Sequence, residues 1–284
     1  MTRNLGILAV LGLFMTTACG SANQVIIGGH ARPQTFHNIV SLSPSTTELF
    51  LYAGQINDLR GRTSSDDFPV TVKNIPIVAK VKPDYEAIAA LKPDLVLADR
   101  QLYSPSDLAK IQELGAKVFI WDPLTISDYE KQLIALAELI GNESQVSTYI
   151  DKIKQAQENA VSAAHGQHLS VALISPDPSG HDLWCGTGSF QADELKAAQL
   201  TLVGPGGSNF VPLDAEALIK ADPDFILLIG PEYQSFVKDP RFQGLKALKA
   251  GHAIDMSENL AYRRGSRVDS FIDHVSRLVY GGAQ

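Results

Sequence analysis

Two glutamates stand at equivalent places in a segment that the chain contains twice. Glu86 opens the stretch EAIAALKPDLVL and Glu216 opens the stretch EALIKADPDFIL, and each stands seven residues before a proline. A carboxylate at a helix start is stabilised by the helix dipole, and an exposed one can also bind a basic side chain of a partner. The dipole accounts for one such glutamate, whereas two at matched positions favour docking onto a partner with two similar halves.

A second set of side chains with binding chemistry falls near the ends of expected strands. Ligands of open α/β sheets bind beyond the carboxyl ends of the strands, where aromatic rings can face a flat ligand and arginines can hold an anion. Caps, core packing and solvated surface charge are the ordinary alternatives for each residue. The candidate ligand contacts are Ser45, Ser65, Phe68, Lys80, Tyr103, Trp121, Trp184, Cys185, Phe190, Tyr262, Arg263 and Arg264.

The motifs of common catalytic sites are absent from the sequence. It has no Gly-x-Ser-x-Gly elbow, no P-loop and no complete dinucleotide fingerprint, and its seven histidines are scattered. We therefore expect no catalytic residue, no metal ligands and no cofactor. A net charge of −7 without a long basic run disfavours nucleic-acid binding, and 45% hydrophobic with 19% charged residues is ordinary for a globular protein.

The N-terminus predicts a secretory signal peptide with a lipid attachment site. Arg3 precedes a short apolar stretch over residues 5–14, and small residues lead to Cys19. We expect residues 1–18 to be a lipoprotein signal peptide, Cys19 to carry a lipid that anchors the protein to a membrane, and residues 19–37 to form a tether. Plain cleavage near Ala18 is the alternative. An acylated Cys19 leaves Cys185 alone, so no intrachain disulfide is expected.

The rest of the chain alternates strand and helix signals, which predicts βαβ units and mostly parallel sheets. Residues 38–125 form the expected N-terminal lobe and residues 167–284 the C-terminal lobe. Between them, residues 126–166 show helical spacing of apolar residues. A helix over residues 144–163 would be about 30 Å long, enough to cross between lobes. The expected fold class is α/β, with two Rossmann-like lobes joined by a long spanning helix.

These features together resemble the substrate-binding proteins of bacterial ABC importers for iron complexes and vitamin B12, most of all the vitamin B12-binding members. The most specific pieces are residues 39–48 (IVSLSPSTTE), 67–69 (DFP), 86–96, 114–118 (LGAKV) and the copy after Glu216. The resemblance implies a class III periplasmic-binding-protein clamp with ligand in the cleft between its lobes. It also implies that Glu86 and Glu216 engage arginines of an ABC permease dimer, which works with ATPase subunits. We expect an extracytoplasmic monomer.

The resemblance implies a metal chelate as ligand, with a corrinoid favoured and a ferric siderophore as the alternative. B12-binding relatives carry cleft aromatic residues where this chain has SSD before residue 67 and VAKVKP at residues 78–83. Heme-binding relatives place a tyrosine ligand in that second stretch, and none is present here. Siderophore-binding relatives use basic and aromatic side chains, a role open to Arg62, Lys80, Trp121 and Trp184. Remoter alternatives are an enzyme or metal-cluster scaffold on a similar fold, and a surface adhesin or receptor.

Overall fold

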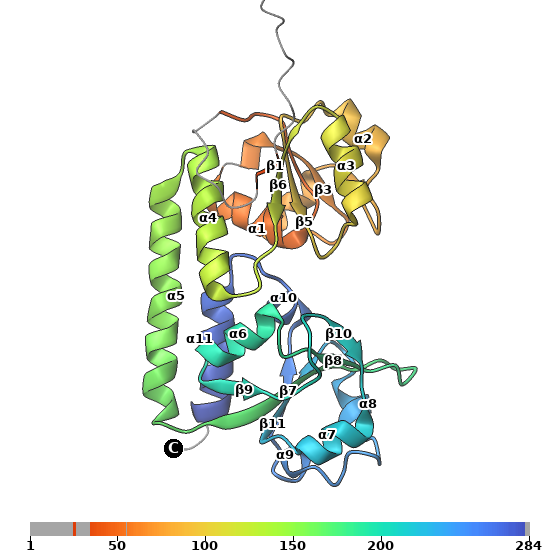
Figure 1. The fold of residues 1–284 in the computed structure, drawn as a ribbon, viewed down its shortest axis with the longest axis vertical. Helices are drawn as coiled ribbons and strands as arrows, with labels where there is room; N and C mark the ends of the chain where they lie inside the picture. The colour runs from red at the N-terminus through yellow and green to blue at the C-terminus, as the bar shows by residue number, and fades with distance from the viewer. Residues whose placement is uncertain (1–24, 27–34, 55, 282–284) are drawn as a thin grey trace, which may run out of the picture.

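Two α/β lobes lie one above the other and are joined along one side by a long helix (Figure 1). The computed structural model describes residues 25–26, 35–54 and 56–281. The expected signal peptide, Cys19 and most of the expected tether therefore lie outside the described residues. The expected fold class, α/β with two lobes and a spanning helix, is confirmed.

The N-terminal lobe is built on a six-stranded sheet in the order β1-β6-β5-β2-β3-β4, in which every pair is parallel. Most of the strands are apolar because helices cover both faces of such a sheet, whereas β3 contains Arg60 and Arg62. They are β1 (Val25–Ile26), β2 (Ile39–Ser41), β3 (Leu59–Thr63), β4 (Ile77–Ala79), β5 (Leu95–Asp99) and β6 (Lys117–Trp121). The helices of this lobe are α1 (Pro44–Ala53), α2 (Tyr85–Ala90) and α3 (Pro105–Glu113).

The first strand corrects the expectation of a tether over residues 19–37. Within that segment, Val25–Ile26 pairs in parallel with Val118 and Phe119 of β6, and Phe36 is buried in the core. A strand that hydrogen-bonds to a sheet edge satisfies backbone groups that the edge would otherwise expose. These residues therefore belong to the lobe.

The C-terminal lobe has a mixed sheet in the order β10-β8-β7-β11-β12, with β9 paired to β7. The pairs among β7, β9, β11 and β12 are parallel, whereas β8 and β10 run antiparallel at one edge. The strands are β7 (Leu169–Ser175), β8 (Leu183–Cys185), β9 (Leu200–Leu202), β10 (Phe210–Pro212), β11 (Phe225–Ile229) and β12 (Ala253–Met256). The helices are α6 (Phe190–Ala197), α7 (Ala215–Ala221), α8 (Tyr233–Val237), α9 (Lys246–Lys249), α10 (Glu258–Ala261) and α11 (Val268–Tyr280).

The repeated segment folds the same way in both lobes. Asp84 caps α2 and Asp214 caps α7, and each Oδ1 accepts a hydrogen bond at 3.0 Å from the backbone N–H three residues on. The aspartates of the two Pro-Asp pairs, Asp94 and Asp224, accept hydrogen bonds from backbone N–H groups at the starts of β2 and β7. Each copy therefore encodes a capped helix, a buried strand and a bond to the neighbouring strand.

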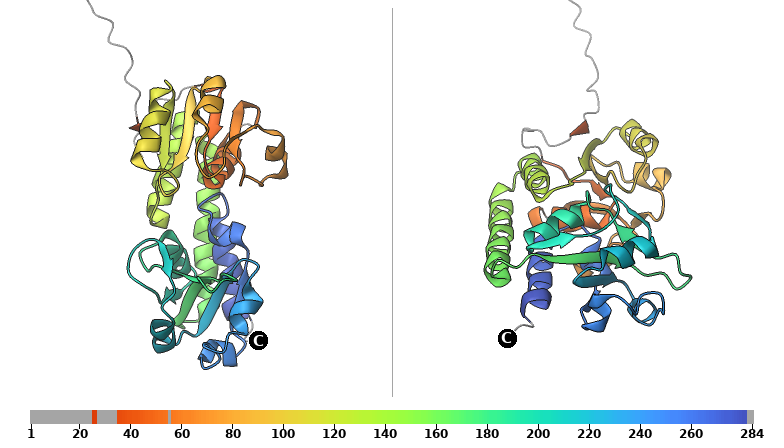
Figure 2. Two further views of the ribbon diagram at one scale, coloured as in Figure 1. Left: turned by 90° about the vertical axis from the view of Figure 1, so that its right-hand side faces the viewer. Right: turned by 60° about the horizontal axis from the view of Figure 1, so that its bottom comes forward.

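Two helices join the lobes, α4 (Ile126–Ile140) and α5 (Glu143–Ala164). They are separated at Gly141, whose φ of 74° is the left-handed conformation that ends many helices. With 22 residues, α5 is about 33 Å long, and it runs beside α4 in one lobe and α11 in the other (Figures 1 and 2). Among the described residues, no helix has the length and apolar composition of a membrane span.

A buried polar cluster lies where α4, α5, α6 and α11 meet. The Tyr129 hydroxyl donates to the carbonyl of Gly265 at 2.7 Å, and the Tyr149 hydroxyl accepts from a backbone N–H of α11 at 2.9 Å. Glu194 of α6 is buried near both tyrosines, and its Oε1 has no hydrogen-bond partner among the described residues. Burial raises the pKa of Glu194 well above its ordinary value, although nearby Arg264 acts against this shift.

We predict that Ile153→Ala lowers the free energy of unfolding by about 3 kcal/mol, because its loss leaves a cavity in the core. Ile153 is fully buried on the inner face of α5. Urea unfolding followed by circular dichroism measures the change. Val161→Ala is the control, since Val161 lies on the same helix and is 56% exposed. Equal losses in the two variants would contradict this packing of α5.

Glu194→Gln should raise the melting temperature at pH 7.5 but not at pH 4. The folded state raises the pKa of Glu194 above 4.5, so unfolding allows the carboxyl to ionise. This favours the unfolded state progressively as the pH rises above 4.5. Glutamine keeps the shape and removes the titration. Calorimetry across this pH range is the measurement, and a lower melting temperature at pH 7.5 would mean that Glu194 is charged and needed in the fold.

Candidate functional site

A pocket of about 540 Å³ lies between the two lobes. Its N-terminal wall comes from residues at or after the carboxyl ends of the parallel strands β2, β3, β4 and β5, as the general rule for open α/β sheets predicts. Its C-terminal wall comes from α10 and the residues that lead to α11. The wall residues that the sequence analysis named are Ser45, Ser65, Lys80, Tyr103, Tyr262, Arg263 and Arg264.

The N-terminal wall offers exposed apolar side chains that the sequence analysis missed. Val81 is 90% exposed and Leu102 is 55% exposed, and both line the pocket. They adjoin Lys80 and Tyr103, which the sequence analysis did name. Exposed apolar groups at a pocket are free to contact a ligand. Tyr103 offers less surface to a ligand, because its side chain is buried and its hydroxyl donates to the carbonyl of Leu42 at 2.6 Å.

Tyr262 is the aromatic residue of the C-terminal wall. Its ring packs edge-on against Phe210, with ring centroids 5.3 Å apart, and it remains 38% exposed. Burial of the hydroxyl end raises the pKa of Tyr262. A ring that is fixed on one side and open on the other suits contact with a flat ligand.

An ion cluster joins the lobes beside this pocket. Glu48 of α1 is buried, and its carboxylate accepts hydrogen bonds from Arg263 at 3.0 Å and from Arg267 at 2.6 and 3.1 Å. Arg263 also donates to Asp67 at 2.6 Å and to the carbonyl of Ser65 at 3.1 Å. We call Glu48, Asp67, Arg263 and Arg267 the interlobe ion cluster. It pairs acids of the N-terminal lobe with arginines of the C-terminal lobe.

The contacts within the cluster shift the pKa values of Arg263 and Asp67 toward the charged forms. Burial lowers the pKa of Arg263, but hydrogen bonds to Asp67 and Glu48 outweigh it and hold the pKa above its ordinary value. The hydrogen bond from Arg263 lowers the pKa of Asp67. Both groups are therefore ionised at neutral pH.

Arg264 makes a second, buried interlobe pair. Its Nη2 donates to Asp99 at 2.5 Å, and its Nη1 donates to the carbonyl of Pro123 at 2.7 Å. Its backbone N–H donates to the Ser45 hydroxyl at 3.2 Å. Ser45 is available for this contact because Ser43, not Ser45, caps α1. Arg263 and Arg264 thus stand at the pocket, with their guanidinium groups paired to carboxylates.

Four predicted ligand contacts are corrected by their burial. Trp121 packs edge-on against Tyr129 and donates to the carbonyl of Arg264 at 3.2 Å. Trp184 donates to the carbonyl of Val203 at 3.1 Å. Strand-end position does not reveal which way a side chain points, and the apolar surface of these residues is covered by the core. The four buried residues are Trp121, Trp184, Cys185 and Phe190.

Phe68 stands outside the residues that line the pocket. It is 46% exposed, and its ring lies under the guanidinium of Arg267, 4.9 Å from the ring centroid. Arg62, considered as a siderophore contact, is buried and donates to the carbonyls of Thr63, Ile75 and others of its own lobe. Both side chains therefore have structural contacts that explain them.

Glu86 and Glu216 occupy matching exposed positions, one in each lobe. Each lies in the first turn of its helix, α2 or α7, two residues after the capping aspartate. Figure 1 places both helices on the side of the molecule away from α5. The arrangement presents two carboxylates in equivalent local settings.

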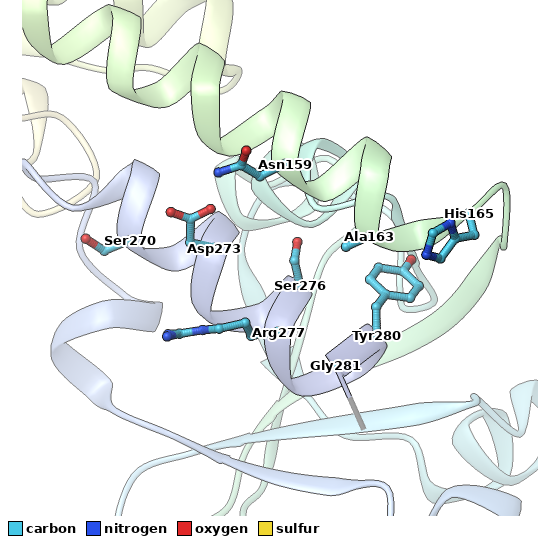
Figure 3. Close-up of a pocket in the computed structure, with 9 residues that line it drawn as sticks. All are labelled: Asn159, Ala163, His165, Ser270, Asp273, Ser276, Arg277, Tyr280 and Gly281. Carbon is cyan, nitrogen blue, oxygen red and sulfur yellow. The ribbon is translucent and has the colours of Figure 1, made fainter. Parts of the chain in front are cut away.

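A different pocket, of about 550 Å³, runs along α5 and α11 (Figure 3). Its lining residues belong to these helices or adjoin their ends, and they include Asn159, His165, Asp273 and Arg277. A site that holds a ligand between lobes needs walls from both lobes. We therefore take the interlobe pocket as the candidate site.

Metal-binding side chains do not gather anywhere in the described part of the chain. No three or more His, Cys, Asp or Glu residues there are grouped so that they could hold a metal ion. Cys185 is a free, buried thiol, and burial raises its pKa to about 11.

Comparison with known proteins gives similar relatives and a similar fold. An uncharacterized ABC transporter substrate-binding lipoprotein, YvrC of Bacillus subtilis (strain 168), is 26% identical over 251 residues, which are 85% of this chain and 79% of that protein. A vitamin B12-binding protein of Yersinia pestis (strain Pestoides F) is 33% identical over 123 residues, 43% of this chain and 44% of that protein.

Among solved structures, the periplasmic heme-binding protein RhuT from Roseiflexus sp. RS-1, in apo form, has a TM-score of 0.77 at 21% identity. The match covers 87% of this chain and 99% of that one, and it shows that the two share a fold. Residues 39–260 match the family model described as periplasmic binding protein. Because this match spans most of the chain, the protein belongs to the periplasmic binding protein family.

Proposed function

We propose that this protein captures a metal chelate between its lobes, outside the cytoplasmic membrane, and delivers it to an ABC permease. The observation that carries the proposal is the interlobe pocket, whose walls come from both lobes and include exposed apolar and aromatic side chains. Family membership supports a binding role over catalysis. The lipid anchor at Cys19 and the signal peptide before it are part of the proposal, because they would hold the protein near the permease.

A corrinoid is the favoured ligand. The relative named as a vitamin B12-binding protein supports this choice, and so do Val81, Leu102 and Tyr262, which offer apolar contact to a large ring. A ferric siderophore is the second candidate, because Lys80 adds an exposed cation to the same pocket. Both ligands would be held by contacts alone, without covalent chemistry.

Docking is assigned to Glu86 and Glu216. Two exposed carboxylates in equivalent settings on similar lobes suit a permease dimer that presents a basic residue from each subunit. The permease with its ATPase subunits is the proposed partner, and the binding protein acts as a monomer.

Calorimetric titration of the full chain in detergent with cyanocobalamin should show saturable one-to-one binding. Tyr262→Ala should weaken it about tenfold or more, because a buried aromatic contact of this kind contributes more than 1 kcal/mol. Leu278→Ala is the control, since this residue of α11 is similarly exposed and lies outside the pocket. An unchanged affinity in Tyr262→Ala would place the ligand elsewhere.

The double variant Glu86→Ala, Glu216→Ala should keep its ligand affinity and lose most uptake in a transporter reconstituted in vesicles. The expected loss follows from the removal of both charge-assisted contacts to the permease. Glu113→Ala combined with Glu158→Ala removes two exposed helix glutamates elsewhere and should leave uptake unchanged. Normal uptake by the first double variant would refute the assignment of docking.

A further inference from the structure

The charges around the interlobe pocket balance, and each arginine of its wall is already paired. The positive groups that line the pocket or pair within the interlobe ion cluster are Lys80, Arg263, Arg264 and Arg267, and the negative ones are Glu48, Asp67, Asp99 and Glu258. We infer that the pocket selects chelates without net negative charge, because its arginines spend their donors on interlobe carboxylates. The inference rests on the proposed function and narrows the ligand class.

Arg263 leaves few N–H donors for an anionic ligand. Its Nη1 donates to both Glu48 and Asp67, and its Nη2 donates to the carbonyl of Ser65. An arginine has five N–H donors in a fixed fork, and here the Nη1 arm of that fork is paired with the acids of the other lobe. The side chain is only 12% exposed.

Arg264 also uses the donors of its guanidinium group within the protein. Its pair with Asp99 is buried on both sides, and a second nitrogen of its guanidinium donates to a backbone carbonyl. The two charged wall residues outside these pairs are Lys80 and Glu258, and they have opposite signs. An anionic ligand would therefore meet one cation and one anion, with little net attraction.

An anion could gain Arg263 only by displacing its partners. The Glu48 side chain is 1% exposed, and the removal of a cation from a buried carboxylate is strongly unfavourable. The net charge of −7 adds a weak long-range repulsion. Neutral chelates, which include corrinoids and ferric trihydroxamates, avoid both costs. Both costs apply to anionic chelates, such as heme with its two propionates, ferric citrate and ferric tricatecholates.

The test compares chelates of different charge on the full chain in detergent. The probes are cyanocobalamin, ferrichrome as a neutral ferric trihydroxamate, hemin, and a ferric tricatecholate, titrated at low and high NaCl concentrations. We expect a neutral chelate to bind at least about tenfold more tightly than either anionic one, with an affinity that salt barely changes. Tighter binding of an anionic chelate, weakened by salt, would overturn the inference and leave the transport role standing. Binding of no chelate would overturn both.

A variant that removes one negative charge tests whether the charge balance at the pocket causes the selectivity. Asp67→Asn keeps an acceptor for Arg263 and deletes one negative charge, so affinity for the tricatecholate should rise about tenfold while affinity for the neutral chelate changes less than about twofold. Asp239→Asn is the control, because Asp239 pairs with Arg241 away from the pocket. A melting curve checks that Asp67→Asn is folded. If the variant is unfolded, the comparison of neutral and anionic chelates on the wild-type protein still tests the inference. Equal anion affinities in the two folded variants would overturn the assigned cause.

Discussion

The carboxylate of Glu48 lies buried between two arginines of the opposite lobe, and this contact joins the two lobes beside the pocket. A buried charge is tolerated only when it is paired and hydrogen-bonded, so Glu48 holds the segment that carries Arg263 and Arg267 against the N-terminal lobe. That segment also forms the C-terminal wall of the pocket. The same ions that join the lobes therefore determine what charge remains for a ligand.

The spanning helix supplies the second constraint. Helix α5 packs against both lobes along one side, while the interlobe ion cluster connects them beside the pocket. In the proposed docking, a two-fold symmetric partner would recognise Glu86 and Glu216, one from each lobe. The repeated helix–strand unit places both glutamates in the same local geometry.

The errors in the predicted site share one physical cause. Trp121, Trp184, Cys185 and Phe190 were placed near strand ends correctly, but their side chains point into the core, where large apolar groups gain most from burial. Val81 and Leu102 are the exposed apolar residues of the pocket, and the sequence does not predict this role. The type of an apolar residue does not show whether its side chain is buried or exposed. Arg263 is among the ligand contacts that the sequence predicts, whereas its pairing with Glu48, 215 residues away, has no signal in the sequence.

Local signals were enough for the two-lobed architecture and the equivalence of Glu86 and Glu216, because periodicity, caps and an internal repeat are short-range properties of a chain. The lining of the pocket is determined only by the tertiary structure. Which wall residues face a ligand, and which arginines remain unpaired, depends on contacts between lobes far apart in sequence, where burial and charge pairing outweigh any local preference.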